Sequence, residues 1–207
     1  MRYDKGHKDA TRQRIIDVAS RQFREQGVAA VGLAGIMSDA GLTNGAFYAH
    51  FDSKEDLVRE VLSHAGFRNK LKAAESGAGL QSAIRGYLSA SHRDNPGGGC
   101  PTSALVAEIA RHPRATRDAF TNKVADVVEL IAGLLPPGSE AERRGKAIAI
   151  YGLMVGTLQL ARAVNDRKLS SEILESGADQ AVALVGQGSD ARGGAGEAAP
   201  DTSPSTR

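Results

Sequence analysis

The chain has 207 residues, of which 41% are hydrophobic, and it carries one cysteine and a formal net charge of only +2. This length and composition predict one large or two small folded domains, and the single cysteine excludes a disulfide within the chain. The first residues lack the apolar segment of a signal peptide, and no stretch is long and apolar enough to span a membrane. A cytoplasmic protein that does not interact with membranes is therefore expected.

The N-terminal residues divide into a basic arm and a helix. Residues 1–9 are expected to form a flexible arm, and residues 1–24 carry seven basic and three acidic side chains. Such a charge run is usually a solvated surface, but beside a DNA-binding motif it favours contact with phosphates. Ile15, Ala19 and Phe23 repeat every four residues, which predicts a helix from residue 9 or 10 to Gln26 that Gly27 ends.

Two short helices are predicted to follow and to meet at a glycine. Leu33, Ile36 and Ala40 lie at spacings of three and four, as on one face of a helix. Gly41 stands where the end of a helix needs a left-handed residue. Thr43 is expected to cap the next helix through its hydroxyl.

The second of these helices has two unlike sides. Its apolar side comprises Ala46, Phe47 and Phe51, and its outer side comprises Thr43, Asn44, Gly45, Tyr48 and His50. A helix of about two turns needs support from the rest of the protein, and a small, polar, uncharged face fits a DNA major groove. The alternative is an ordinary helical pair within an all-α domain, which the helix-turn-helix pattern alone does not exclude.

The run from Ala40 to Phe51, followed by Ser53-Lys54-Glu55-Asp56-Leu57, resembles the DNA-binding motif of the TetR/AcrR family of transcriptional regulators. The resemblance covers roughly residues 10–62. It implies that the bases are faced by Thr43, Asn44, Gly45 and Ala46, and that the DNA backbone is contacted by Tyr48, His50 and Lys54. Gly32 departs from the family pattern, which usually has a Ser or Thr cap there, so DNA affinity is expected to depend more on the basic arm.

The rest of the chain predicts helices and no strands. Ser53 is expected to cap a fourth helix over residues 53–74, which joins the two halves of the protein and ends at the glycines of residues 76–79. Further helices are expected over residues 80–92, 101–112, 114–135, 140–165 and 170–185. Residues 187–207 are rich in Gly, Ala, Pro, Ser and Thr, which predicts a disordered tail.

The expected fold class is therefore all-α. An N-terminal three-helix helix-turn-helix domain occupies residues 10–53, and a C-terminal helical domain for effector binding and dimerisation occupies residues 54–186. In the helix over 140–165, Gly152 and Gly156 lie four residues apart within an almost wholly apolar stretch and permit close approach of another helix. The last two helices either fill the core of one chain or, as the resemblance implies, pair with a second copy in a homodimer.

The effector pocket is expected among the middle helices. Its candidate lining residues are Tyr87, Phe120, Tyr151, Met154 and Leu158, with ordinary core packing as the alternative. Cys100 precedes Pro101 at a predicted helix start, a location that favours a reactive thiol, although a small packed residue explains it equally. The histidines show no spacing typical of metal ligands, so no metal site is expected.

The resemblance implies a ligand-responsive regulator, preferentially a repressor, that binds a pseudo-palindromic operator in double-stranded DNA as a homodimer and responds to an unknown small-molecule effector. The alternative is a helical small-molecule-binding protein or enzyme without DNA binding. The sequence lacks Ser/His/Asp, His-Glu-x-x-His and Gly-Lys-Ser/Thr constellations, so neither catalysis nor a cofactor is expected. A helical adaptor is a third class, and it would not need the Tyr-x-His-Phe segment.

Overall fold

The computed structural model describes residues 5–63, 71, 74 and 77–186, and these residues contain helices and no strand. In chain order the elements are α1 (Lys5–Gln26), α2 (Leu33–Asp39), the 3₁₀ helix η1 (Asn44–Ala49), α3 (Lys54–Ser63), α5 (Gly77–Tyr87), α6 (Ala90–Asp94), α7 (Pro101–Ile109), α8 (Arg114–Leu134), α9 (Glu140–Ala163) and α10 (Arg167–Gly186). The expected tail, the first residues of the arm and most of the stretch between residues 64 and 76 lie outside the described residues. None of the described helices is long and apolar enough to cross a membrane.

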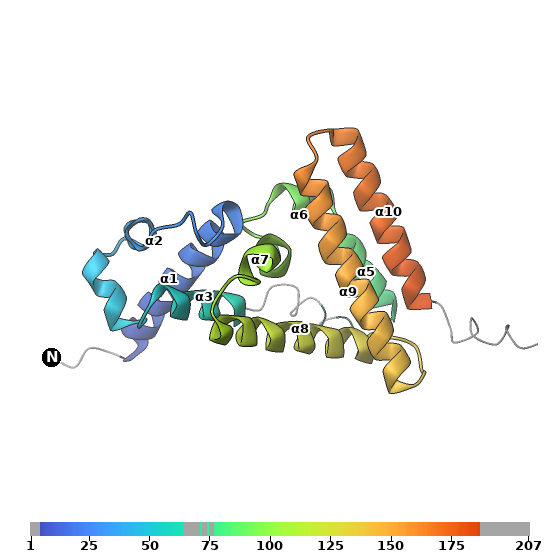
Figure 1. Ribbon diagram of the computed structural model, residues 1–207, viewed down its shortest axis with the longest axis horizontal. Helices are drawn as coiled ribbons and strands as arrows, with labels where there is room; N and C mark the ends of the chain where they lie inside the picture. The colour runs from blue at the N-terminus through green and yellow to red at the C-terminus, as the bar shows by residue number, and fades with distance from the viewer. Residues whose placement is uncertain (1–4, 64–70, 72–73, 75–76, 187–207) are drawn as a thin grey trace, which may run out of the picture.

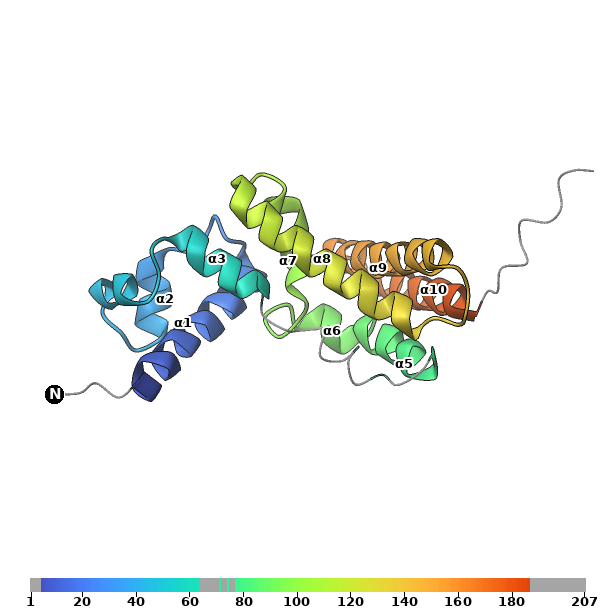
Figure 2. The ribbon, with the colours of Figure 1, turned by 90° about the horizontal axis from the view of Figure 1, so that it is seen from below.

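The described helices form two groups. Figures 1 and 2 show α1, α2 and α3 at one end of the molecule, α9 and α10 side by side at the other, and α7 between them. Each group has its own buried apolar cluster, which we call the N-terminal core and the C-terminal core. The N-terminal core includes Leu57, Val58, Val61 and Leu62 of α3, so this packing unit extends past the expected domain boundary at residue 53.

Several expected boundaries differ from the structure, among them the end of α7 at Ile109 and the start of α10 at Arg167. Residues 5–9, expected in a flexible arm, form the first turns of α1. The glycines at 77 and 79 begin α5 instead of preceding it, and at Gly79 a Cβ would lie only 3.1 Å from Ala74. The single helix expected over residues 80–92 is interrupted at Ser89, whose extended backbone and hydroxyl cap a separate helix, α6, by accepting from the His92 amide at 3.3 Å.

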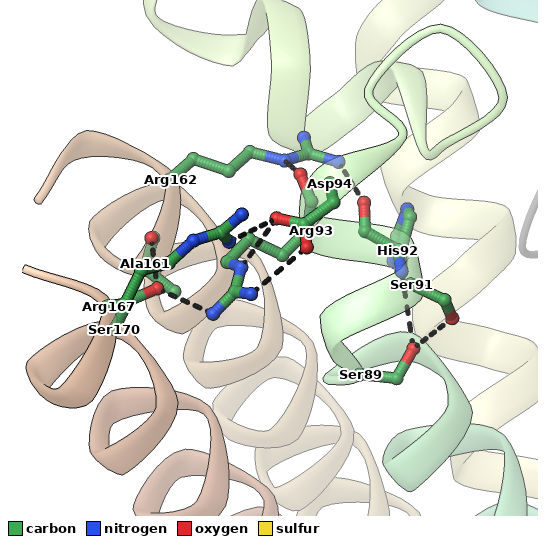
Figure 3. A network of polar contacts seen from close by, with 9 residues as sticks. All are labelled: Ser89, Ser91, His92, Arg93, Asp94, Ala161, Arg162, Arg167 and Ser170. Carbon is green, nitrogen blue, oxygen red and sulfur yellow. Dashed lines mark hydrogen bonds and ion pairs between the residues drawn. The ribbon is translucent and has the colours of Figure 1, made fainter. Parts of the chain in front are cut away.

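A polar network fastens α6 to the junction of α9 and α10 (Figure 3). The buried Arg93 donates to the Asp94 carboxylate at 2.8 and 3.0 Å and to Ser170 Oγ at 2.9 Å. Ser170 in turn donates to the Ala161 carbonyl at 2.6 Å, and Arg167 donates to Asp94 at 2.8 Å. Hydrogen bonds from Arg93 and then Arg167 hold the pKa of Asp94 far below its usual range, so this carboxylate stays ionised at neutral and mildly acidic pH.

We expect Arg93→Met to lower the free energy of unfolding by about 1–3 kcal/mol, because it removes the donors that this network shares. Urea denaturation measures the loss. Arg85→Met is the matched control, since the Arg85–Asp179 pair at 3.0 Å is largely exposed. That control should cost less than about 1 kcal/mol. Similar losses for the two variants would contradict a structural role for the Arg93 network.

Candidate nucleic-acid interface

The turn between α2 and η1 has the geometry expected from its glycine. Gly41 has a φ of +69°, in the left-handed region that favours glycine. Its amide donates to the Ser38 carbonyl, and the Leu42 amide donates to the Met37 carbonyl, both at 2.9 Å. These bonds close the end of α2 and turn the chain into η1, as the sequence predicted.

Two phenylalanines hold η1 on the N-terminal core. Phe47 is fully buried and Phe51 nearly so, and their rings stack with centroids 5.4 Å apart. The Tyr48 and Phe47 rings are perpendicular with centroids 5.3 Å apart, yet Tyr48 is 69% exposed. A six-residue 3₁₀ helix is too short to be stable alone, so these buried rings fix its position.

The outer side of η1 carries the residues predicted to meet DNA. Thr43, Asn44, Gly45 and Tyr48 are exposed, whereas Ala46 is half-buried against the N-terminal core. The expected hydroxyl cap by Thr43 is wrong: Thr43 occupies the cap position, but its side chain makes no capping bond. The Ala46 amide bonds instead to the Thr43 carbonyl at 3.0 Å, because the short 3₁₀ helix closes through main-chain atoms. The Thr43 hydroxyl remains on the exposed face.

His50 lies half-buried behind this face. Burial, and then the positive charges of Lys8 and Arg12, lower the pKa of His50 below its ordinary value. The imidazole is therefore neutral at pH 7. Its Nδ1 atom is buried and has no hydrogen-bond partner among the described residues. A neutral imidazole can hydrogen-bond a phosphate, but it contributes no charge to the contact.

The Lys54 side chain is fixed by contacts within the N-terminal domain. Its ammonium donates to the Val28 carbonyl at 2.6 Å and lies 5.9 Å from the centre of the Phe23 ring. Arg12 is likewise paired with Glu60 at 2.8 Å and lies over the Phe51 ring. The resemblance could not indicate these contacts, because they join residues far apart in the sequence.

The start of α3 is close to the prediction. The Ser53 hydroxyl accepts from the Asp56 amide at 3.1 Å, as an N-terminal cap does. Asp56 accepts in return from the Asp52 amide, at 3.3 Å, rather than from that of Ser53. The cap fixes where α3 begins and so where Lys54 stands.

A second candidate site is a cavity of about 260 Å³ beside α8. Its described lining residues are Ser63, Cys100, Pro101, Ala119, Asn122, Lys123, Asp126, Val127 and Tyr151. Five of them follow the helical spacing of one face of α8, where three polar residues lie between Ala119 and Val127. This mixed face is the signal in the sequence that could have indicated these lining residues.

Only one of the five predicted effector residues lines this cavity. Tyr151 does, and its hydroxyl donates to Thr102 at 2.9 Å. Burial raises the pKa of Tyr151, and it also raises the pKa of Tyr87, so both phenols stay protonated. Tyr87, Met154 and Leu158 belong to the C-terminal core, as Tyr151 does, but they do not border the cavity, and Phe120 packs against the N-terminal core.

Cys100 is buried at the start of α7 and borders the cavity. Its amide donates to His92 Nε2 at 3.0 Å, while His92 Nδ1 lies 2.7 Å from the Tyr87 carbonyl. His92 therefore carries its proton on Nδ1. Among the described residues no group of His, Cys, Asp and Glu could hold a metal ion.

The fold and the geometry of η1 define a two-domain helical protein with a helix-turn-helix. A family model described as bacterial regulatory proteins, tetR family, matches residues 15–61. Over 51 residues the chain is 51% identical to the HTH-type transcriptional regulator AcrR of Shigella flexneri, covering 25% of this chain and 24% of that protein. Over 59 residues it is 39% identical to the HTH-type transcriptional repressor KstR2 of Rhodococcus jostii, covering 28% and 29%. The chain thus aligns with less than a third of the length of these two relatives.

The similarity in fold extends over most of the chain. A solved TetR transcriptional regulator from Legionella pneumophila superimposes with a TM-score of 0.70 at 20% identity, covering 87% of this chain and 98% of that one. The N-terminal region, at residues 15–61, thus matches the TetR family of bacterial regulatory proteins, and the rest of the chain shares the fold of the solved regulator.

Proposed function

We propose that the protein is a cytoplasmic, dimeric transcriptional repressor that binds a pseudo-palindromic DNA operator and responds to a small molecule. The observation that carries the proposal is the exposed outer face of η1, fixed on the buried rings of Phe47 and Phe51. Lys8 and Arg14 of α1 are also exposed and supply positive charge in the same domain. Repression is supported by the name of the relative KstR2.

Dimerisation is supported by an exposed apolar stripe on α9. Ile148 is 52% exposed and Leu160 is 60% exposed, and Gly152 lies between them on the same side. A Cβ at Gly152 or Gly156 would meet no atom within 4 Å, so a neighbouring helix can approach closely there. A pair of these faces would create a two-fold axis, and two η1 elements could then contact two half-sites of one duplex.

The effector proposal rests on the cavity beside α8. Its deeper lining, at Val127, Tyr151 and Cys100, is buried, while Asn122 and Asp126 are exposed. A compact molecule with an apolar body and one polar group fits such a lining. The alternative function, a small-molecule-binding protein without DNA binding, uses the same cavity but gives the outer face of η1 no role.

Selection of bound sequences from a random duplex pool tests the proposal. We expect recovery of a two-fold pseudo-palindrome by the full chain. No enrichment would remove DNA binding from the proposal and favour the small-molecule-binding alternative. Enrichment of a single, unrepeated half-site would retain DNA binding and exclude the dimeric operator.

Two substitutions on η1 should have different effects. Asn44→Ala should cost about 1–3 kcal/mol against the preferred base at one position of each half-site, because Asn can form paired hydrogen bonds with adenine. Tyr48→Phe should weaken binding to every sequence by a similar factor, because a phosphate contact carries no sequence information. Affinity against a panel of single-base operator variants measures both effects. A uniform loss for Asn44→Ala would contradict its assigned contact with a base.

A further inference from the structure

Helix α7 belongs to both halves of the protein. Its cap residue Cys100 lies in the C-terminal core and borders the cavity, whereas Leu105 and Ile109 are buried in the N-terminal core. The first turn of α7 is fastened to α9 through the hydrogen bond from Tyr151 to Thr102. Both ribbon views place α7 between the two groups of helices (Figures 1 and 2). A short rigid helix held at both ends can transmit a displacement from one end to the other.

One carboxylate near the end of α7 holds the turn between α1 and α2. Glu108 Oε2 accepts from the Val28 amide at 2.8 Å, and Glu108 Oε1 accepts from the Ala29 amide at 2.6 Å. The preceding Gly27 has a φ of +85°, and a Cβ there would lie 3.2 Å from Glu108 Oε2. Two charge-assisted bonds to adjacent amides fix both the position and the direction of the turn. We call this contact the Glu108 clasp.

The clasped turn leads directly into the DNA-binding elements. Val28 donates its amide to Glu108 and accepts on its carbonyl from Lys54, the first residue of α3. Helices α2 and α3 precede and follow η1 in the chain. Because the turn leads into α2 and contacts the first residue of α3, the Glu108 clasp helps to fix the orientation of both helices that flank η1.

The polar contacts of α3 with α8 and the turn before it act on whole helices. Glu55 of α3 accepts from Thr116 at 2.6 Å and lies 3.0 Å from His112 Nδ1, and Lys123 of α8 donates to the Leu62 carbonyl at 2.6 Å. These contacts fasten the body of α3 to α8. The Glu108 clasp differs because it engages two main-chain amides of the turn that leads into α2.

We propose that Glu108 is a positioning residue for operator binding. Its clasp sets the orientation of each η1 relative to α7, and so the separation of the two η1 elements in the dimer. The inference rests on the proposed function. It also connects the cavity to the DNA-binding domain, from Cys100 and Pro101 along α7 to the turn, in addition to the contacts between α3 and α8.

The test compares Glu108→Gln with Glu129→Gln in the full-length dimer. A glutamine of similar size can accept from one of the two amides but presents a donor to the other. Glu129 is an exposed partner of Arg144 near the far end of α8, so its variant removes the same charge away from the DNA-binding domain. Affinity is measured on duplexes with the selected half-sites at their natural spacing, at spacings changed by one or two base pairs, and on a single half-site.

Wild-type protein and Glu129→Gln should prefer one spacing strongly. Glu108→Gln should lose about tenfold in affinity at that spacing, the size expected for charge-assisted bonds, while its affinity for a single half-site changes by less than about twofold. Its preference among spacings should flatten. An equal loss on single and paired half-sites would overturn the proposal, because the clasp would then only support the local fold. An unchanged spacing profile would overturn it as well.

Hydrogen exchange at the Val28 and Ala29 amides, measured without DNA, tests the clasp itself. Exchange should accelerate in Glu108→Gln and stay at the wild-type rate in Glu129→Gln. Unchanged exchange in Glu108→Gln would overturn the inference whatever the DNA results are. A different outcome is slow wild-type exchange at these amides together with no preference for any duplex. That outcome would overturn both the proposed function and the positioning role. The clasp would then remain only as a structural contact.

Discussion

Replacing Phe47 with alanine should lower the free energy of unfolding of the N-terminal domain by about 3–5 kcal/mol, the usual cost of deleting a buried aromatic ring. Phe47 is fully buried, stacks on Phe51 and supports Tyr48 from below. Its loss leaves a cavity under a 3₁₀ helix that cannot hold its own shape. Operator binding should therefore be lost together with stability, as measured by urea denaturation and by DNA affinity on the same variant.

Tyr48→Ala provides the contrast for Phe47→Ala. The Tyr48 side chain is mostly exposed, so its removal should change stability by less than about 0.5 kcal/mol, as is usual on the surface. DNA affinity should nevertheless fall. If Phe47→Ala kept wild-type stability, or if Tyr48→Ala cost as much stability as Phe47→Ala, the division of η1 into a buried and a DNA-facing side would be wrong.

Gly152→Glu should separate the proposed dimer without harming the fold of the chain. A Cβ at Gly152 would meet nothing within 4 Å, and replacing a glycine inside a helix improves helix propensity by up to about 1 kcal/mol. A charged side chain between two closely approaching α9 helices would, however, prevent their contact. Losing the second half-site should lower operator affinity by about 10²–10⁴-fold. Analytical ultracentrifugation and DNA affinity measure the two effects.

The control for Gly152→Glu is the same substitution at Gly133. Gly133 is an exposed glycine of α8 where a Cβ would also meet nothing within 4 Å, but it lies outside α9 and α10. Gly133→Glu should remain dimeric and bind operator with wild-type affinity. A dimeric Gly152→Glu protein would show that α9 does not form the interface at this position.

The sequence by itself indicated the helices and the motif. The spacing of Ile15, Ala19 and Phe23 is a local property of one helix, and it marked the side that is buried. The glycines expected to end two helices, Gly27 and Gly41, could also be recognised from the sequence, and the structure gives both of them a positive φ. These features depend on neighbours within a few residues, so the chain order alone defines them.

The ends of the helices were harder to predict from the sequence. Ser89 was expected within a helix, but its side chain caps α6 instead, because the cap and the Arg93 network together stabilise the break. A serine is compatible with either role, and contacts from α9 and α10 decide between them. The same holds for Thr43, whose hydroxyl was expected to cap η1 and does not.

Only the tertiary structure decided which side chains border the cavity and which contacts join the domains. Met154, Leu158 and Val127 are all buried in the C-terminal core, yet of these three only Val127 borders the cavity. Periodicity identifies the inner side of a helix but not where facing helices fail to fill the space between them. Glu108 carries no motif either, because its partners are main-chain amides about eighty residues earlier. Such a partner is set by the path of the folded chain and not by any side chain that the sequence displays.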